Sequence, residues 1–278
     1  MNEKNKQLIR EEIVRLSKLS SQNRVANRVG VSSATISQII NNNWRLIKPE
    51  MWRKIKVRLK LDLNWNTAPT AMFRDLTLFL DTAKNNQSTV SFSHQAGTGK
   101  SHLYNHYQRV VPNVIYIEGT KTMSKKTYIK KLLVNAGQDA IGTTEELMEQ
   151  FIDHVSELEQ PLIIIDQFDK LKENTFDLFM DFYNELYGHC GFVISGVKAL
   201  EKRILMGVQR NKIGYEEIWS RMDRKFIKLY ATTREDVKLI FEANGVSDKL
   251  AITESYNSCG GDLRRVKKDV LKYQLNND

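Results

Sequence analysis

The chain has 278 residues, of which 41% are hydrophobic, with four prolines and two cysteines. This length suits two unequal domains, and the composition excludes a chain that is mainly disordered. No apolar run approaches the ~20 residues that a membrane span needs, and the first residues are too polar for a signal peptide. Because Cys190 and Cys259 lie far apart outside any metal-binding pattern, we expect reduced thiols in a cytoplasmic protein without a membrane partner.

The net charge of +9 lies entirely in the first quarter of the chain. Residues 1–65 contain 14 of the 42 basic and 5 of the 33 acidic residues, so residues 66–278 are balanced at 28 of each. A compact region that is this basic is typical of a polyanion binder, although a solubilising surface would give the same composition. We therefore expect the N-terminal region to bind nucleic acid.

The N-terminal region is predicted to be all-α. Two short helices are expected at its centre, one over about Gln22–Val29 and one after Ser32, which is a good N-cap. Gly30 supplies the turn between them, because glycine adopts positive φ at little cost. Further helices over Leu8–Leu19 and Pro49–Leu61 complete the prediction. The apolar residues that recur at helical spacing and face inward are Val25, Ala26, Val29, Ile36, Ile39 and Ile40.

This pattern is a helix-turn-helix. Residues 6–63 resemble the λ repressor and Cro class at the small Ala26, the turn residue Gly30 and the apolar Val31. The resemblance implies that the second short helix reads DNA, whereas a bundle that packs against a protein partner is the alternative. That helix lacks arginine, the commonest reader of guanine, so we expect double-stranded DNA to be bound with little sequence specificity. The expected contacts to bases or phosphates are Arg24, Arg28, Ser33, Thr35, Ser37 and Gln38.

A second, α/β region follows a break in the helical pattern at residues 62–71, which predicts a linker. Short apolar segments then alternate with helical ones, which is typical of a parallel sheet with helices on both faces. The predicted strands are Thr89–Ser93, Val114–Ile117, Leu162–Ile165, Phe192–Ser195 and Phe226–Leu229. We expect a DNA-binding domain at 1–65, an α/β core at 72–230 and a helical lid at 231–278.

A phosphate-binding loop is expected directly after the first strand, because residues 94–101 end in the GKS of the pattern GxxxxGK[ST]. His94 replaces the first glycine of that pattern, which affects the geometry of the loop more than its capacity for phosphate. Lys100 would reach the β- and γ-phosphates of ATP, and Ser101 would ligate Mg²⁺. The residues expected to bind nucleotide here are Gly97, Thr98, Gly99, Lys100 and Ser101.

The third predicted strand ends in Asp166, the position of the acid that holds Mg²⁺ in P-loop ATPases. The next residue is normally a glutamate that orients the attacking water, but here it is Gln167. An amide can hydrogen-bond water but cannot take its proton, so hydrolysis is expected to be slow. Either the protein is naturally a poor ATPase, or Gln167 is an engineered replacement of glutamate. Asp169, one helical turn further on, is expected to be a surface or capping acid.

Further positions resemble those of AAA+ ATPases. Ser195 ends the fourth predicted strand, where a polar sensor of the γ-phosphate belongs. Arg221 and Arg224 precede the last predicted strand, where such proteins place an arginine finger that acts on the neighbouring subunit. Arg264 matches the arginine of the second sensor motif in the lid. A solvated surface charge is the alternative for each arginine.

The order of domains resembles that of the phage Mu B transposition proteins and related transposon target-capture ATPases. These proteins of mobile elements form ATP-dependent helical filaments on DNA and deliver the DNA to a transposase. The resemblance implies a bacterial or phage-encoded protein that forms a homo-oligomer or filament on DNA. The alternatives are a replication-type ATPase, such as a helicase loader or plasmid partition protein, and a transcription regulator gated by nucleotide.

A local group of lysines supports this resemblance. Lys126 and Lys130 are four residues apart and share one face of the helix predicted over Ser124–Ala136. The resemblance implies that DNA lies against this region of each subunit, and a solvated helix face is the alternative. The lysines concerned, called here the α/β lysine patch, are Lys121, Lys125, Lys126, Lys130 and Lys131.

Overall fold

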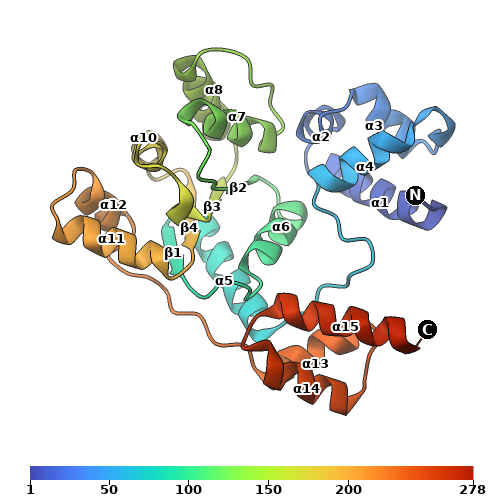
Figure 1. Cartoon of the computed structure of the whole chain (residues 1–278). Helices are drawn as coiled ribbons and strands as arrows, with labels where there is room; N and C mark the ends of the chain where they lie inside the picture. The colour runs from blue at the N-terminus through green and yellow to red at the C-terminus, as the bar shows by residue number, and fades with distance from the viewer. Residues whose placement is uncertain (278) are drawn as a thin grey trace.

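The computed structural model describes residues 1–277, and its N-terminal region is a helical unit that stands to one side of the sheet (Figure 1). Its helices pack around the fully buried Trp52. Gly30, between the two central helices, has a φ of 70°, and Ser32 caps the second of them. These two helices and their turn are confirmed. The helices are α1 (Glu3–Leu19), α2 (Gln22–Val29), α3 (Ser33–Ile40) and α4 (Pro49–Arg58), with a 3-10 turn at Trp44–Leu46.

The second region contains a four-stranded parallel sheet in the order β1-β4-β3-β2. Its strands are β1 (Thr89–Ser93), β2 (Val114–Glu118), β3 (Leu162–Asp166) and β4 (Gly191–Gly196). The apolar runs of β2, β3 and β4 have both faces buried, as parallel strands between helical layers require, whereas β1 at the edge is partly exposed.

Helices cover both faces of this sheet, so the predicted α/β fold is confirmed. One face is covered by α5 (Ala71–Asn85) and α6 (Lys100–Val110), which share a core with Leu162, Ile164 and Val193. The other face is covered by helices that share a second core with Ile163 and Ile165. These helices are α7 (Lys125–Asn135), α8 (Thr144–Ser156), α9 (Glu173–Phe176), α10 (Leu178–Glu185), α11 (Ala199–Gln209) and α12 (Tyr215–Arg221).

The fifth predicted strand, Phe226–Leu229, is wrong as a strand. A single parallel bridge joins Ile227 to Phe92, and the Ile227 N–H donates to the carbonyl oxygen of Ser91 at 2.8 Å. Lys228 is exposed and its neighbours are only half-buried, so the segment buries too little apolar surface to hold a longer ladder at the sheet edge.

The lid has its own small core, formed by α13 (Arg234–Ala243), α14 (Lys249–Cys259) and α15 (Leu263–Asn277). The segment predicted as a linker is fixed against it. The Asn66 N–H donates to the side-chain oxygen of Asn244 at 2.9 Å, and the Asn244 amide donates back to the Asn66 carbonyl oxygen at 3.1 Å. The segment therefore holds the lid beside the sheet.

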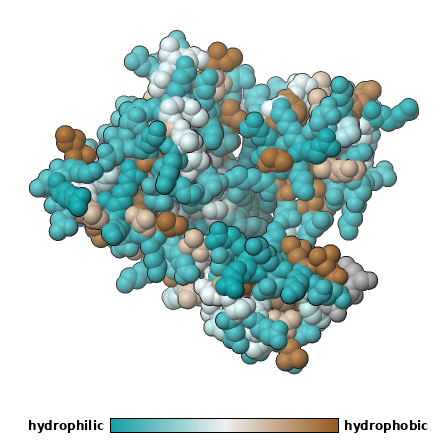
Figure 2. Space-filling view, viewed as in Figure 1, coloured by the Kyte–Doolittle hydropathy of each residue, from teal (hydrophilic) through white to brown (hydrophobic). Residues whose placement is uncertain are grey.

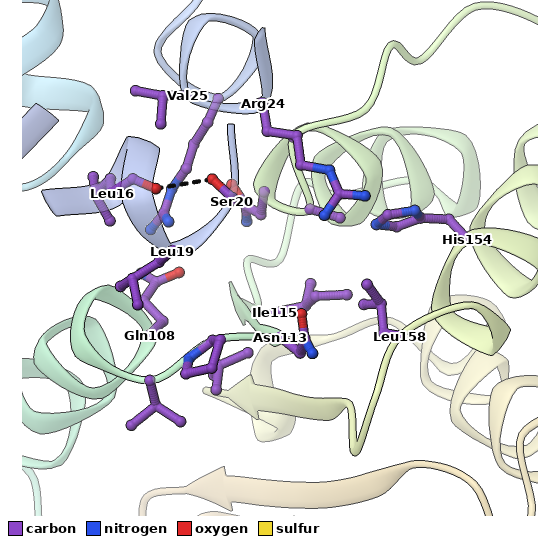
Figure 3. Close-up of a pocket in the computed structure, with 17 residues that line it drawn as sticks. Leu16, Leu19, Ser20, Arg24, Val25, Gln108, Asn113, Ile115, His154 and Leu158 are labelled. Carbon is purple, nitrogen blue, oxygen red and sulfur yellow. Dashed lines mark hydrogen bonds between the residues drawn. The ribbon is translucent and has the colours of Figure 1, made fainter. Parts of the chain in front are cut away.

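The N-terminal unit contacts the α/β core through α2 and the end of α7. The side-chain amide of Asn27 donates to the carbonyl oxygen of Gly137 at 3.2 Å, and Arg15 donates to the carbonyl oxygen of Arg109. A cavity of about 70 Å³ lies between the two units, lined by side chains that include Leu16, Arg24 and His154 (Figure 3). The two units are thus packed against each other.

The visible surface is mainly polar. The face shown in Figure 2 is largely hydrophilic, with apolar side chains in small separate groups. Along residues 1–277, no helix is both long enough and apolar enough to cross a membrane.

Candidate nucleotide-binding site

The loop between β1 and α6 turns sharply at two glycines. Gly97 and Gly99 have φ of 84° and 97°, a region that other residues rarely adopt. A Cβ added at Gly97 would lie 2.2 Å from a carboxylate oxygen of Asp262, and the Leu263 N–H donates to the Gly97 carbonyl oxygen at 2.8 Å. The lid therefore packs directly on the predicted phosphate loop, and only glycine fits at position 97.

Lys100, the first residue of α6, lies under this loop and is 7% exposed. Its Nζ donates to the carbonyl oxygens of Gln95 at 2.8 Å and His94 at 3.3 Å. Burial lowers the pKa of Lys100, while the nearby carboxylates of Asp166 and Asp169 oppose that shift. A buried cation at the amino end of a helix is well placed to bind a phosphate group.

Asp166 ends β3 beside the same loop and is buried. Its carboxylate accepts hydrogen bonds from the Ser101 hydroxyl, from the Tyr116 hydroxyl at 3.3 Å and from the Gln167 N–H at 2.9 Å. Burial raises its pKa, although the bonds from Ser101 and Gln167 and the charge of Lys100 act in the opposite direction. A carboxylate and a hydroxyl in contact are the hard oxygen donors that Mg²⁺ prefers, so Ser101 and Asp166 would hold that ion.

A cavity of about 450 Å³ opens beside these residues. This volume lies in the range of about 300–1,000 Å³ that is usual for small-molecule sites. Apolar side chains from the linker, α5 and the lid form one part of the wall, and charged side chains form the other. The residues that define these two parts are Trp65, Phe73 and Leu263, and Lys100, Asp166 and Arg264. The arrangement suits a ligand with a flat apolar group and a polyanionic tail.

Gln167 has a left-handed backbone, with a φ of 54°, and its side chain turns towards β2. Its amide nitrogen donates to Glu118, and its amide oxygen accepts from Lys170. The second carboxylate oxygen of Glu118 lies 2.8 Å from the Nζ of Lys60, from the N-terminal unit. Partial burial raises the pKa of Glu118, but Lys60, Gln167 and Lys170 outweigh that effect and hold it below its ordinary value.

Glu118 was not among the sequence-based candidates. The signal that could have identified it is an acid directly at the end of the second apolar strand, in the same position as Asp166 on the third. The carboxyl ends of neighbouring parallel strands meet at one edge of a sheet, where ligands of such folds bind.

The two predicted sensor residues have different environments. Arg264 lines the cavity and forms a two-fold contact with Asp262, with nitrogen–oxygen distances of 2.9 and 2.8 Å. Ser195, in contrast to its prediction, is fully buried within β4, and the cavity wall is formed by Gly196 and Val197 instead. Ser195 therefore does not line the cavity in this arrangement.

The two candidate arginine fingers lie outside the cavity of their own chain. Arg221 is held over the ring of Tyr183, 5.3 Å from its centroid. Arg224 is 61% exposed and forms a surface ion pair with Glu216. Of the two, Arg224 is the more exposed side chain.

The predicted DNA-contacting residues of α2 and α3 separate into two groups. Ser33, Ser37 and Gln38 lie at least partly exposed on α3. Thr35, in contrast to its prediction, is buried, and its hydroxyl lies 2.9 Å from that of the N-cap Ser32. Its side chain completes the start of the helix and does not reach the surface.

Arg24 and Arg28 face the α/β core, which also differs from their prediction. Arg24 lies against Gly137 and extends towards His154 (Figure 3). Burial lowers the pKa of Arg28 to about 10, against the opposing charge of Glu12. Both side chains are only partly exposed, because α2 lies on the side of the N-terminal unit that packs on the core. The basic side chains that remain exposed near α3 and α4 include Arg45, Lys48, Arg53, Lys54 and Arg58.

The α/β lysine patch lies on α7 and on the loop before it. Lys121, Lys126 and Lys131 are exposed, and Lys125 and Lys130 are half-buried. None of the five forms an ion pair with another residue in the described part of the chain. The helix buries its opposite face, which contains Ile129 and Leu132, so the lysines remain on the outside.

Comparison with known proteins agrees with the core described above. Residues 69–204 match the family described as AAA domain. No curated protein matches the chain significantly. The matched segment contains all four strands, the glycine loop and Asp166. The chain therefore contains an AAA-type P-loop ATPase domain, which is a nucleotide-binding domain.

Proposed function

We propose that the protein is an ATP-dependent DNA-binding AAA+ ATPase that assembles on target DNA and delivers that DNA to a transposase. The α/β lysine patch is the observation that carries DNA binding, because it stands on the outside of a domain that is neutral overall, and none of its lysines forms an ion pair in the described part of the chain. The role in transposition rests on the order of domains, which resembles that of the phage Mu B proteins.

ATP with Mg²⁺ is the proposed ligand of the 450 Å³ cavity. Lys100 binds the β- and γ-phosphates, Ser101 and Asp166 hold the ion, and Arg264 approaches the phosphates from the lid. The adenine ring lies against Trp65 and Phe73. These roles agree with the charged and apolar parts of the cavity wall.

Assembly of several copies is proposed from the position of Arg224. This exposed arginine lies outside its own cavity, so it would complete the site of the next subunit. Bound ATP would then join neighbouring subunits, and DNA would follow the assembled lysine patches. A transcription regulator would instead bind DNA through the N-terminal unit alone, where Ser33, Ser37 and Gln38 lie on α3.

The lysine pair Lys126→Ala/Lys130→Ala tests which surface binds DNA. We expect the pair to weaken ATP-dependent DNA binding at least tenfold and to lower the slope of log affinity against log salt by roughly two, since each lost phosphate contact lowers it by about 0.9. The measurement is the anisotropy of a labelled duplex titrated with protein, ATP and Mg²⁺ at several salt concentrations.

A matched control is Lys268→Ala/Lys272→Ala, an exposed pair with the same four-residue spacing on α15, which should leave binding unchanged. An Arg45→Ala/Arg53→Ala pair in the N-terminal unit should weaken ATP-dependent DNA binding less than the Lys126→Ala/Lys130→Ala pair does. If the arginine pair abolishes binding and the α7 pair is silent, the regulator is the better account.

A further inference from the structure

We infer that Glu118, at the end of β2, is the carboxylate that takes the proton of the attacking water during ATP hydrolysis. The inference rests on the proposed ATPase function and assigns a catalytic residue that β3, which ends in Asp166, does not supply. Gln167, directly after Asp166, is an amide and cannot accept a proton at neutral pH.

The sheet places Glu118 beside the proposed metal ligand. In the parallel register of β2 and β3, Glu118 is the partner of Asp166, and the Gly119 N–H donates to the Asp166 carbonyl oxygen at 2.8 Å. Neighbouring strands lie about 4.8 Å apart, so the two acids begin from adjacent backbone positions at the ligand-binding edge.

Hydrogen bonds connect Glu118 to the cavity through Gln167. The Gln167 amide donates its N–H to a Glu118 oxygen and accepts from Lys170 through its own oxygen. Since a carboxylate only accepts and an ammonium only donates, these partners fix which end of the amide faces β2. Gln167 and Lys170 line the cavity, and Glu118 lies directly behind them.

Other acids near the cavity have different partners. Asp166 accepts from Ser101 and Tyr116 and is the proposed ligand of Mg²⁺. Asp169 accepts from the Val197 N–H at 3.2 Å, and Asp262 is held by Arg264. Among the described residues, the Glu118 carboxylate is bonded only by flexible side chains, those of Lys60 and Gln167, and its side chain is 37% exposed. A change of rotamer can therefore exchange the Gln167 amide for a water molecule.

In the step that follows, the water oxygen attacks the γ-phosphorus of ATP and transfers one proton to the Glu118 carboxylate. The bond between the γ-phosphorus and the bridging oxygen breaks, and its electron pair remains on ADP. The products are ADP and phosphate, and Glu118 returns its proton to solvent. Gln167 accepts a hydrogen bond from the same water and orients it.

Exchange of the two side chains tests the assignment. Glu118→Gln should lower kcat at least tenfold while KM and the affinity for a fluorescent ATP analogue stay within about threefold of wild type. The double variant Glu118→Gln/Gln167→Glu keeps one acid and one amide in contact but moves the carboxylate to β3, and it should recover kcat to within about threefold of wild type. Glu145→Gln, an exposed acid on α8, is the control and should change nothing.

The assignment would be overturned if wild type and Glu118→Gln have the same kcat, or if neither hydrolyses ATP. A double variant that stays as slow as Glu118→Gln would also overturn it. If Glu118→Gln does not fold, Glu118→Asp replaces it. The shorter acid should lower kcat at unchanged nucleotide affinity, and unchanged kcat would overturn the assignment. Failure of the proposed function would give a different result. The wild-type protein would then bind ATP, but its affinity for duplex DNA would be the same with and without ATP.

Discussion

A buried lysine is the residue on which the nucleotide site depends most. In the described part of the chain, Lys100 donates hydrogen bonds to two loop carbonyl oxygens and to the Thr98 hydroxyl. Because none of these acceptors is charged, the charge of Lys100 is available for a phosphate. Lys100→Ala should lower the affinity for ATP at least a hundredfold, because it removes the cation under the loop without altering the glycine turns. Fluorescence titration with a labelled ATP analogue measures this loss.

The control for that titration is Lys202→Ala, an exposed lysine on α11 far along the chain from the loop. It should bind the analogue as wild type does. Wild-type affinity in Lys100→Ala would show that the cavity does not bind ATP through this loop.

Local motifs made part of the site predictable from sequence. Lys100 and Ser101 follow from one short pattern, and Asp166 follows from an acid at the end of an apolar strand. Glu118 also follows an apolar strand, but its contact with Gln167, 49 positions away in the chain, could not be predicted from that local pattern. Ser195 was assigned by its place at a strand end, whereas every residue of β4 is buried, Ser195 included.

Among the elements, α8 contributes a histidine to the cavity beside α2, between the N-terminal unit and the α/β core. This histidine should make the stability of that interface depend on pH. His154 is buried in that cavity, its Nδ1 lies 3.2 Å from the Gln138 amide, and burial and the charge of Arg24 lower its pKa. Its contribution to stability is full above its ordinary pKa of about 6.5 and is lost as the pH falls below that value, because the unfolded chain then binds a proton that the folded chain resists.

His154→Gln keeps a neutral polar side chain at this position and should therefore lose less thermal stability than wild type between about pH 7.5 and about pH 5.5. Part of the pH dependence should remain, since burial also lowers the pKa of His102 and His106. Thermal unfolding at the two pH values measures the difference. An equal fall in Tm for both proteins would contradict this role of His154.

The segment after α12 contains the residue expected to join subunits. Arg224→Ala should abolish ATP-dependent assembly on DNA, because its guanidinium is exposed and would reach the next subunit's phosphates. Arg221→Ala is the comparison, since that side chain is held over Tyr183 and should affect assembly less. Light scattering with ATP and duplex DNA compares the two, and normal assembly of Arg224→Ala would exclude it as the finger.

The elements that could be predicted are those with strong local signals. The N-caps Ser32 and Ser124 and the turn at Gly30 set the starts of α3 and α7 and the end of α2, and these boundaries agree with prediction to about one residue. Phe226–Leu229 has the composition of a strand but lies at the sheet edge with a single bridge, and its pairing depends on neighbours that composition does not reveal.

The whole molecule brings three units around one cavity. The linker, α5 and the lid supply its apolar wall, the core and Arg264 of the lid supply its charged wall, and Lys60 of the N-terminal unit reaches Glu118 behind it. The packing of α2 on the core could not be predicted, because Arg24 and Arg28 have the composition of a DNA-binding surface and only their contacts show otherwise. The surfaces proposed to bind DNA are therefore the exposed cations of α4 and the α/β lysine patch.

The dependence of DNA binding on nucleotide tests the central claim most directly. Wild-type protein is titrated into a labelled duplex with ATP and Mg²⁺, with ADP and Mg²⁺, and without nucleotide, at one salt concentration near physiological. ATP-dependent assembly predicts affinity at least tenfold higher with ATP than in the other two conditions, equivalent to about 1.4 kcal/mol. The same affinity in all three conditions would contradict the account, because the cavity and the DNA-binding surfaces would then act independently.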